Sequence, residues 1–205
     1  MTRQDLGTLA LRTQEVYERN AERFDRERSR VLFERCWLDR MVDGLGRGAA
    51  VLDLGCGAGD PIAAYMDSRG FHVVGLDASR AMLRIAGKRF PQGDWRLGDM
   101  RRLDLAERFD AILGWDSFFH LTAEEQRGTL IRIAAHLRPS GRVMLTVGPT
   151  SGEVAGHVGD DAVYHASLSP QEYTQRLDAL GLDMLDFVKE DPAAWGRTVL
   201  LARKR

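Results

Sequence analysis

Cysteine is scarce in this sequence. The two that occur, Cys36 and Cys56, are far apart and form no C-x-x-C pair, so neither a disulfide framework nor a cysteine-based zinc site is indicated. No apolar run approaches the roughly 20 residues of a membrane span, and residues 1–5 lack the apolar core of a signal peptide. These absences predict a cytoplasmic protein with neither a membrane nor a metal as partner.

An excess of charge of either sign is also missing. The 205 residues include 29 basic and 30 acidic side chains, for a net charge of −1. Sequence-independent binding of nucleic acid needs a positive field, which this balance does not supply, so no nucleic-acid partner is expected. With 44% apolar residues, the chain is long enough for one core and too short to assume two. We expect a single domain over residues 1–205.

The most informative segment that is present reads Val-Leu-Asp-Leu-Gly-Cys-Gly-Ala-Gly, at residues 51–59. An apolar strand here runs into three glycines at alternating positions. Because Gly55, Gly57 and Gly59 have no Cβ, the backbone can turn tightly and approach a ligand closely. We interpret residues 51–59 as a ligand-binding loop at the end of a strand.

This loop departs from the two common phosphate-binding motifs. Asp60 stands where the dinucleotide fingerprint G-x-G-x-x-G has its third glycine, and G-x-x-x-x-G-K-[ST] is absent. A pyrophosphate would bind poorly beside Asp53 and Asp60, because both carboxylates would repel it. A cationic ligand without phosphate fits the loop better.

Hydrophobic spacing predicts alternating strands and helices. Apolar residues in segment 8–43 recur at spacings near three and four, which indicates two helices. Such spacing and alternation along the rest of the chain predict strands at 49–54, 72–77, 94–98, 109–115 and 141–147, helices at 60–69, 79–88, 123–137 and 170–180, and apolar runs at 182–188 and 197–203. A βαβ series of this kind predicts a parallel sheet with right-handed crossovers.

Four further blocks follow the glycine loop in order. They are Gly-Leu-Asp-Ala-Ser at 75–79, Gly-Asp-Met at 98–100, Phe-Asp-Ala-Ile-Leu-Gly-Trp-Asp at 109–116, and His-Leu-Arg-Pro-Ser-Gly at 136–141. Together with the glycine loop they resemble the motifs of the class I S-adenosylmethionine (SAM) dependent methyltransferases of the small-molecule type. The resemblance spans about half of the chain and departs from the family at Arg142, where a second glycine is common.

The resemblance implies a fold and a cofactor. The fold is α/β and Rossmann-like, with a mostly parallel seven-stranded sheet, an antiparallel last strand, helices on both faces and an N-terminal helical cap. Residues 1–45 would form the cap, 49–148 the SAM-binding core, 149–168 a substrate-side insertion, and 169–205 a C-terminal helix and hairpin. The implied cofactor is SAM, which leaves as S-adenosyl-L-homocysteine (SAH).

The resemblance also assigns residues to the cofactor. Asp77 ends the second strand, where an acid accepts hydrogen bonds from ribose hydroxyls, and Asp53 supports the ammonium group of the methionine part. Asp99 accepts from the adenine amino group, or is a simple turn residue. Tyr17 and Trp37 line the methionine part, or pack in the core. The complete set is Tyr17, Trp37, Asp53, Gly55, Gly57, Asp77, Ala78, Asp99, Met100 and Trp115.

The resemblance implies that residues 115–121, at the end of the fourth expected strand, face both the sulfonium and the acceptor. They read Trp-Asp-Ser-Phe-Phe-His-Leu, without the Asp/Asn-Pro-Pro-aromatic motif of methyltransferases that act on exocyclic base amines or amides. His120 is a candidate general base or hydrogen-bond partner, because histidine titrates near neutrality. Its alternative role is a cap for the helix expected from Thr122. Asp116 is a candidate for orienting the acceptor, or a loop acid.

The insertion 149–168 is expected to define the acceptor. Tyr164 and His165 would point inward from a lid, or the segment would be a surface hairpin built on Asp and Gly turns. Its histidines and acids lack the spacing of a metal site. The candidate catalytic residues are therefore His120, Asp116, Tyr164 and His165.

The predicted function is in-line transfer of a methyl group from SAM to a small-molecule acceptor. The alternatives are an NAD(P)-type oxidoreductase, a SAM-binding protein without turnover, and an RNA or protein methyltransferase. The sequence leaves open the identity of the acceptor and whether O, N, S or C is methylated. It also leaves open the use of a general base, and whether the protein is a monomer or a homodimer.

Overall fold

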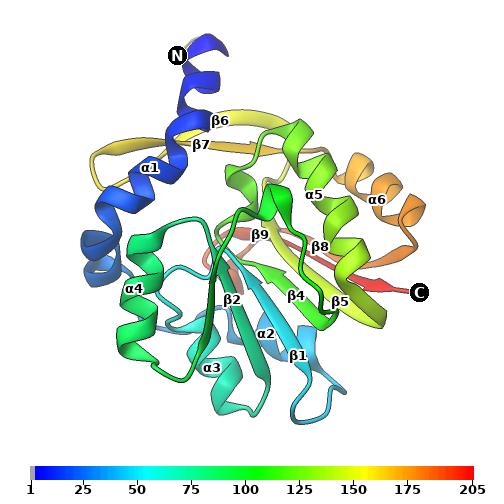
Figure 1. Ribbon diagram of the computed structural model, residues 1–205. Coiled ribbons are helices and arrows are strands. Elements are labelled where there is room, and N and C mark those ends of the chain that lie inside the picture. Colours follow the sequence, from blue (N-terminus) through cyan, green and yellow to red (C-terminus); the bar gives the residue numbers. More distant parts are fainter. Residues whose placement is uncertain (1–2) are drawn as a thin grey trace.

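The computed structural model describes residues 3–205, so Met1 and Thr2, which belong to the segment without a signal-peptide core, lie outside the described residues. Its centre is a seven-stranded sheet in the order β3-β2-β1-β4-β5-β9-β8 (Figure 1). The strands are β1 (Ala50–Leu54), β2 (His72–Asp77), β3 (Asp94–Leu97), β4 (Phe109–Gly114), β5 (Leu137–Val147), β8 (Leu182–Asp191) and β9 (Arg197–Lys204). Strands β1 to β5 are parallel, and β9 pairs antiparallel with β5 and β8. The expected mostly parallel sheet with an antiparallel last strand is confirmed.

The order of the strands reverses at β1. This strand pairs with β2 on one side and with β4 on the other, so the connections from it lead toward opposite edges of the sheet. Ligands of doubly wound sheets bind in the crevice at such a point, outside the carboxyl ends of the strands. Leu54, Asp77 and Gly114 end the three strands concerned. The loops that follow these residues therefore meet at one crevice.

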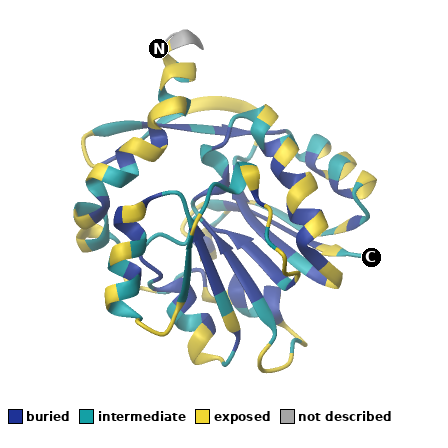
Figure 2. Cartoon of the chain, in the orientation of Figure 1, coloured by how far each residue is buried: buried dark blue, intermediate teal, exposed yellow. Residues whose placement is uncertain are grey.

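Helices cover both faces of the sheet, as expected. Helices α2 (Arg35–Val42) and α3 (Ile62–Ser68) pack on one face, and α5 (Ala123–His136) and α6 (Pro170–Ala179) pack on the other. Figure 2 shows the strands between them mostly buried. A strand covered on both sides has no face toward solvent, and residues 51–54 of β1 are accordingly all buried.

Side chains at the helix starts explain where two of these helices begin. Thr122 caps α5 in a reciprocal capping box with Glu125. Ser169 caps α6, and Pro170 occupies the first turn of that helix, as the sequence predicts. Because Thr122 fills the cap position of α5, the alternative of a capping role for His120 is wrong.

Helix α1 (Arg3–Glu27) lies above the carboxyl edge of the sheet together with a separate hairpin (Figure 1). The hairpin consists of β6 (Gly152–Val158) and β7 (Asp161–Ser167), which pair antiparallel. Helix α1 also packs along α4 (Arg80–Arg89). Its contact with the hairpin buries three valines, Val16, Val158 and Val163. We call α1 and the β6–β7 hairpin together the roof.

The start of strand β5 differs from the sequence prediction. Strand β5 begins at Leu137, four residues before the expected start, and follows α5 directly. The pairing of β4 with β5 is irregular between Phe109 and Ala111, and Ser140 has a φ of 64°. A left-handed residue followed by glycine is typical of a turn, so the sequence pattern alone placed the strand after it.

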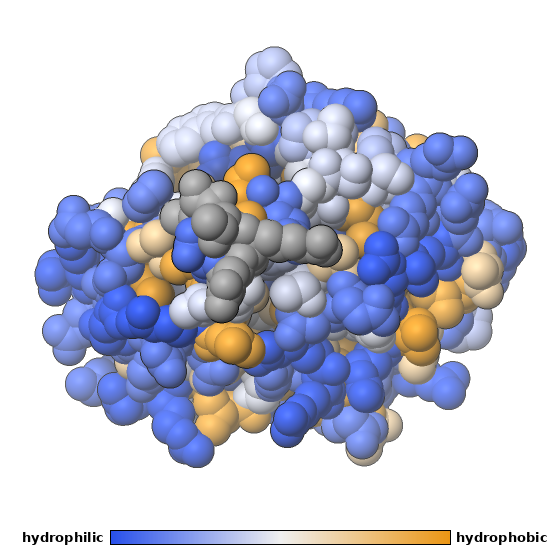
Figure 3. Space-filling view, turned by 90° about the horizontal axis from the view of Figure 1, so that it is seen from above, coloured by the Kyte–Doolittle hydropathy of each residue, from blue (hydrophilic) through white to orange (hydrophobic). Residues whose placement is uncertain are grey.

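No helix among residues 3–205 is long and apolar enough to cross a membrane. The same described residues contain no group of three or more His, Cys, Asp and Glu side chains arranged to hold a metal ion. On the face seen from above in Figure 3, hydrophilic side chains dominate and apolar ones form separate patches.

Candidate active site

Two pockets meet beneath the roof. The inner pocket lies at the carboxyl ends of β1, β2 and β4, and the outer pocket lies between α1, the β6–β7 hairpin and the turn that joins β8 to β9. Four residues line both pockets: Tyr17, Phe24, Arg28 and Asp116. Tyr17, Phe24 and Arg28 lie seven and four positions apart, a spacing that places them on one face of α1 and at its end. This helical spacing was present in the sequence and could have identified Phe24 and Arg28 as pocket residues.

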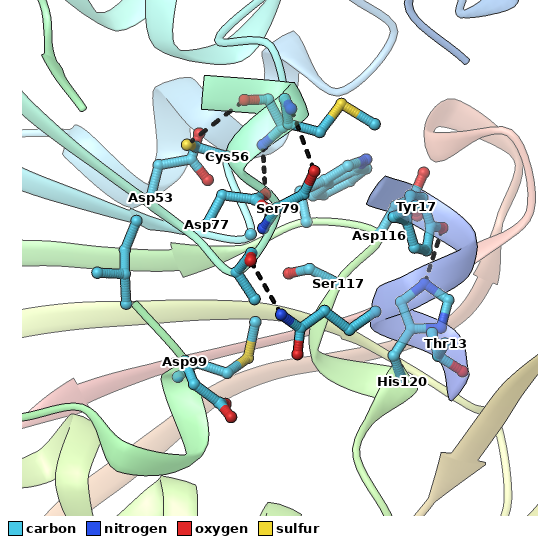
Figure 4. A pocket seen from close by; sticks show the side chains of 18 of the residues that line it. Thr13, Tyr17, Asp53, Cys56, Asp77, Ser79, Asp99, Asp116, Ser117 and His120 are labelled. Carbon is cyan, nitrogen blue, oxygen red and sulfur yellow. Dashed lines mark hydrogen bonds between the residues drawn. The ribbon is translucent and has the colours of Figure 1, made fainter. Parts of the chain in front are cut away.

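Nine of the ten residues expected at the cofactor line the inner pocket. They are Tyr17, Asp53, Gly55, Gly57, Asp77, Ala78, Asp99, Met100 and Trp115. Figure 4 shows Asp53 and Asp77 on one side of this pocket, Tyr17 and His120 on the other, and Asp99 toward one end. Residues from Tyr17 to Trp115, which are distant in the sequence, therefore converge on one cavity.

The glycine loop is tightly packed at Gly55 and open at Gly57. Gly55 has a φ of +75°, and a Cβ there would collide with the Cβ of Ser117. Gly57 has a φ of +54°, and a Cβ there would meet no atom within 4 Å. The backbone at Gly57 is thus open toward the pocket, as a loop that approaches a ligand closely requires.

Asp77 is held in place by backbone donors. The N–H of Gly57 donates to Oδ2 at 2.8 Å, and the N–H of Ser79 donates to Oδ1 at 2.7 Å. Burial raises the pKa of Asp77, while these two hydrogen bonds lower it. Each carboxylate oxygen can accept a second hydrogen bond, so the oriented Asp77 can still receive two hydroxyl groups of a sugar.

Asp53 is a buried acid without a fixed partner. It is 4% exposed, and among residues 3–205 no group donates a hydrogen bond to its carboxylate. Burial raises its pKa to about 7, and the nearby positive charge of Arg28 opposes this rise. A buried carboxylate that lines a cavity is stabilised by a cation placed there, and the ammonium group of SAM is such a cation.

Arg28 was not identified from the sequence. It stands between the two pockets, 3.6 Å from the carboxylate of Glu34. Glu34 is fully buried, neither of its oxygens accepts a hydrogen bond, and burial raises its pKa. Arg28 is also a cation of the inner pocket close enough to Asp53 to lower the pKa of that acid.

Asp99 is a turn residue that also lines the inner pocket. Its carboxylate accepts from the N–H and the guanidinium of Arg101 at 2.8–2.9 Å, and Arg101 also pairs with Glu125 at 2.9 Å. Gln14 of α1, which also lines the inner pocket, donates to the carbonyl oxygen of Ala78 at 3.0 Å. The Gln14 contact ties helix α1 to the residue that follows β2.

Tyr17 and His120 form a hydrogen-bonded pair at the shared wall (Figure 4). The Tyr17 hydroxyl lies 2.9 Å from Nε2 of His120, and Nδ1 of His120 lies 2.9 Å from the carbonyl oxygen of Tyr164. A carbonyl oxygen only accepts, so Nδ1 carries the proton and Nε2 accepts the proton of Tyr17. Burial lowers the pKa of His120 to about 4 and raises that of Tyr17. Both side chains are neutral near pH 7.

Asp116 is aimed at the same wall by an unusual backbone conformation. Its φ is 50°, and its N–H donates to Thr146 Oγ1 at 2.7 Å. The guanidinium of Arg197 donates to both carboxylate oxygens, at 3.0 and 3.3 Å. Asp116 is therefore a fixed acceptor that borders both pockets.

Two expectations for the site are wrong. The hydroxyl of Tyr164 donates to Glu153 at 2.7 Å and lines neither pocket; only its carbonyl oxygen reaches His120. Trp37 is 2% exposed in the core beside α3, where its Nε1 donates to Asp191 at 2.7 Å. The cause is the same in both, since the side chain points to the packed side of its element.

His165 does line the outer pocket, as expected. Its ring centroid lies 4.9 Å from that of His120 and 4.6 Å from that of Phe119. Successive side chains of a strand point to opposite sides, which explains why His165 faces the outer pocket while its neighbour Tyr164 does not.

Residues 51–141 match the model of a protein family described as a methyltransferase domain. A dTDP-3-amino-3,6-dideoxy-alpha-D-glucopyranose N,N-dimethyltransferase from Streptomyces fradiae is 39% identical over 101 residues, which cover 48% of this chain and 39% of that protein. The methyltransferase GfsG from Streptomyces halstedii is 30% identical over 171 residues, covering 76% of this chain and 61% of that protein. The chain spans less than two thirds of the length of these curated relatives.

Solved structures show the same fold. An amino pentose methyltransferase from Micromonospora echinaspora, solved with SAM bound, has a TM-score of 0.70 and 24% identity, covering 93% of this chain and 97% of that one. The magnesium protoporphyrin IX methyltransferase from Synechocystis has a TM-score of 0.73 and 17% identity, covering 96% and 97%. The motifs, their convergence on one pocket and these likenesses agree, and the chain belongs to the class I SAM-dependent methyltransferases.

Proposed function

We propose that the chain binds SAM in the inner pocket and transfers its methyl group to an amine of a small molecule in the outer pocket. The observation that carries this proposal is the shared wall, because Tyr17 and Asp116 border both cavities. SAM in the inner pocket can present its methyl group at this wall, and an acceptor in the outer pocket can reach the methyl group there directly.

Each part of SAM has a matching group in the inner pocket. Asp53 receives the ammonium group and Arg28 the carboxylate, while Asp77 accepts the ribose hydroxyls and Asp99 the adenine amino group. Bound SAM supplies an electrophilic methyl group on its sulfonium. The protein then needs to align the acceptor, exclude water and leave the nucleophile uncharged.

The acceptor side favours a neutral amine. With its proton donated to His120, the Tyr17 oxygen presents lone pairs, and Asp116 presents carboxylate oxygens; both accept an N–H and leave the nitrogen lone pair free. A neutral amine that displaces the sulfonium takes the positive charge itself, so no base is needed in the transfer. His120, with a pKa of about 4, positions Tyr17 and does not take a proton near pH 7. Amino-sugar relatives support this class of acceptor.

The first test is binding. Calorimetry should show tight binding of SAM and SAH, with NADH as a control ligand that does not bind. Asp77→Ala should weaken SAM binding by about tenfold or more, because hydrogen bonds to a charged group contribute about 1.5–3 kcal/mol. Asp94→Ala is the matched control, since Asp94 pairs with Arg96 outside both pockets. Equal SAM affinity in the parent and Asp77→Ala would contradict the assignment.

The acceptor class has a test of its own. The protein should release SAH from SAM when amines are added, and should not do so with alcohols of matched size.

The second test is the pH dependence of SAM binding. Because the pKa of Asp53 is raised to about 7, the free protein holds a proton there below pH 7 and must release it to pair with an ammonium group. SAM affinity should therefore fall as the pH drops below 7, approaching tenfold per unit. In Asp53→Asn the affinity should be weaker at pH 7 and no longer vary between pH 6 and 7, an interval below the pKa of the α-amino group of SAM. Calorimetry in buffers of different ionisation enthalpy measures the released proton, and a parent protein that releases none at pH 6 would rule out this role.

A further inference from the structure

Trp195 is an exposed aromatic residue in a strained backbone conformation. It follows the 3-10 turn η3 (Pro192–Ala194), which joins β8 to β9, with a φ of 51°. Bulky residues rarely adopt the left-handed region. The side chain is nevertheless 54% exposed, so burial of the indole does not compensate for the strain. Strain of this kind persists where the surrounding structure imposes it, and it is concentrated at functional sites.

The surrounding structure does impose it. Asp191 accepts from the N–H of Ala193 at 2.9 Å and from Trp37 Nε1 at 2.7 Å, and its carbonyl oxygen accepts from the N–H of Gly196 at 2.8 Å. Ala194 is completely buried. The turn is thus tied to the core through the buried Trp37, and these contacts hold the backbone on both sides of Trp195.

One face of the Trp195 indole is already stacked. Phe33 lies parallel to it, with ring centroids 4.2 Å apart and planes 10° apart. Phe33 is also in contact with the Arg197 guanidinium, 4.7 Å from the ring centroid. No other ring among the described residues contacts Trp195. The two rings and Arg197 all line the outer pocket.

The stack of Trp195 and Phe33 is connected to the wall that the two pockets share. Arg197, which lies on Phe33, donates to Asp116 at the shared wall. Asp116 and Trp195 thus line the same outer pocket, which has a volume of about 920 Å³.

We propose that the free face of Trp195 is a binding site for a planar aromatic ring of the acceptor. The inference rests on the proposed function, because it assumes that the outer pocket holds the acceptor. A third flat ring continues the parallel arrangement of Phe33 and Trp195, and ring stacking of this kind favours flat partners. The acceptor would then carry an aromatic ring at a distance from the amine that is methylated.

The test compares benzylamine with cyclohexylmethylamine, which match in size and charge but differ in flatness. Ligand-observed NMR with the SAH-loaded protein measures binding without turnover, so it does not depend on the methyl-transfer assay. The parent should bind benzylamine more tightly, by about tenfold. Trp195→Asn keeps a residue that tolerates a positive φ and should lose this preference. Trp195→Phe should retain it.

Stability and cofactor binding separate a lost ring from a damaged fold. Trp195→Asn should melt at the same or a higher temperature and should bind SAM as the parent does. Ser140→Gly relieves a left-handed residue with a φ of 64° that lines neither pocket, and it should keep the preference for benzylamine. If the parent shows no preference, or if Trp195→Asn retains it, the aromatic site is wrong. Failure to bind SAM would instead overturn the proposed function.

Discussion

Replacing Gly57 by valine should abolish SAM binding while the chain still folds. A Cβ at Gly57 meets no protein atom within 4 Å, so the added side chain fills the cavity without displacing the core. The Gly57 N–H also orients Asp77, and the valine disturbs that contact at a φ of +54°. We expect at least about a hundredfold weaker binding, a loss of about 2.7 kcal/mol, measured by calorimetry with SAM.

The control for Gly57→Val must carry the same backbone strain without the steric effect. Gly181 has a φ of +75°, no atom within 4 Å of a Cβ, and a place outside both pockets. Gly181→Val should lower the melting temperature by a similar amount and leave SAM affinity unchanged. If both variants lose SAM binding equally, strain rather than occupied space is the cause, and the loop is not the cofactor site.

Removing either member of the Tyr17–His120 pair should slow methyl transfer strongly. In His120→Phe the Tyr17 hydroxyl has no fixed acceptor and can donate to the amine nitrogen, which occupies the lone pair needed for attack. In Tyr17→Phe the amine loses the oxygen that orients its N–H. Misplacing a reactant by about 1 Å can cost a hundredfold, and we expect about that loss in kcat for each variant, with SAH release as the readout.

The two residues act as a unit, so their effects should not add. The double variant should be about as slow as each single variant, because either change already removes the oriented hydroxyl. His136→Phe is the matched control. His136 is a second buried histidine, with Nδ1 near a carbonyl oxygen and Nε2 accepting a backbone N–H, but it lines neither pocket. It should lower stability and not kcat. Multiplicative losses in the double variant would show independent roles.

The parts of the fold that depend on local sequence were predictable. Strand β2 spans the predicted residues 72–77, and the loop after β1 places Gly55, Gly57 and Asp77 together, because the motif itself dictates a tight turn beside the neighbouring strand. Helix α6 starts where Ser169 and Pro170 predict. These features need only the residues of one or two adjacent elements.

Long-range packing determined what the sequence did not reveal. Alternation along β7 shows that Tyr164 and His165 point to opposite sides, but not which side faces the site, because that depends on how the hairpin packs on α1. Likewise, Trp37 has the spacing of a packed helix residue whether it lines the cofactor site or packs in the core. The partners that bury it, and Asp191, which accepts its N–H, lie far along the chain.

The buried groups of the site also set how the folded state responds to acid. His120 has its pKa lowered from 6.5 to about 4, so the unfolded chain takes up a proton first and stability falls as the pH drops through this interval. Asp53 has its pKa raised from 3.8 to about 7, so the folded chain takes up a proton first and stability rises on the same descent. In the free protein, the loss of stability due to His120 and the gain due to Asp53 therefore oppose each other as the pH falls. A bound cation at Asp53 keeps that carboxylate ionised and removes the compensating term, so the ligand-bound protein is the more acid-sensitive of the two states.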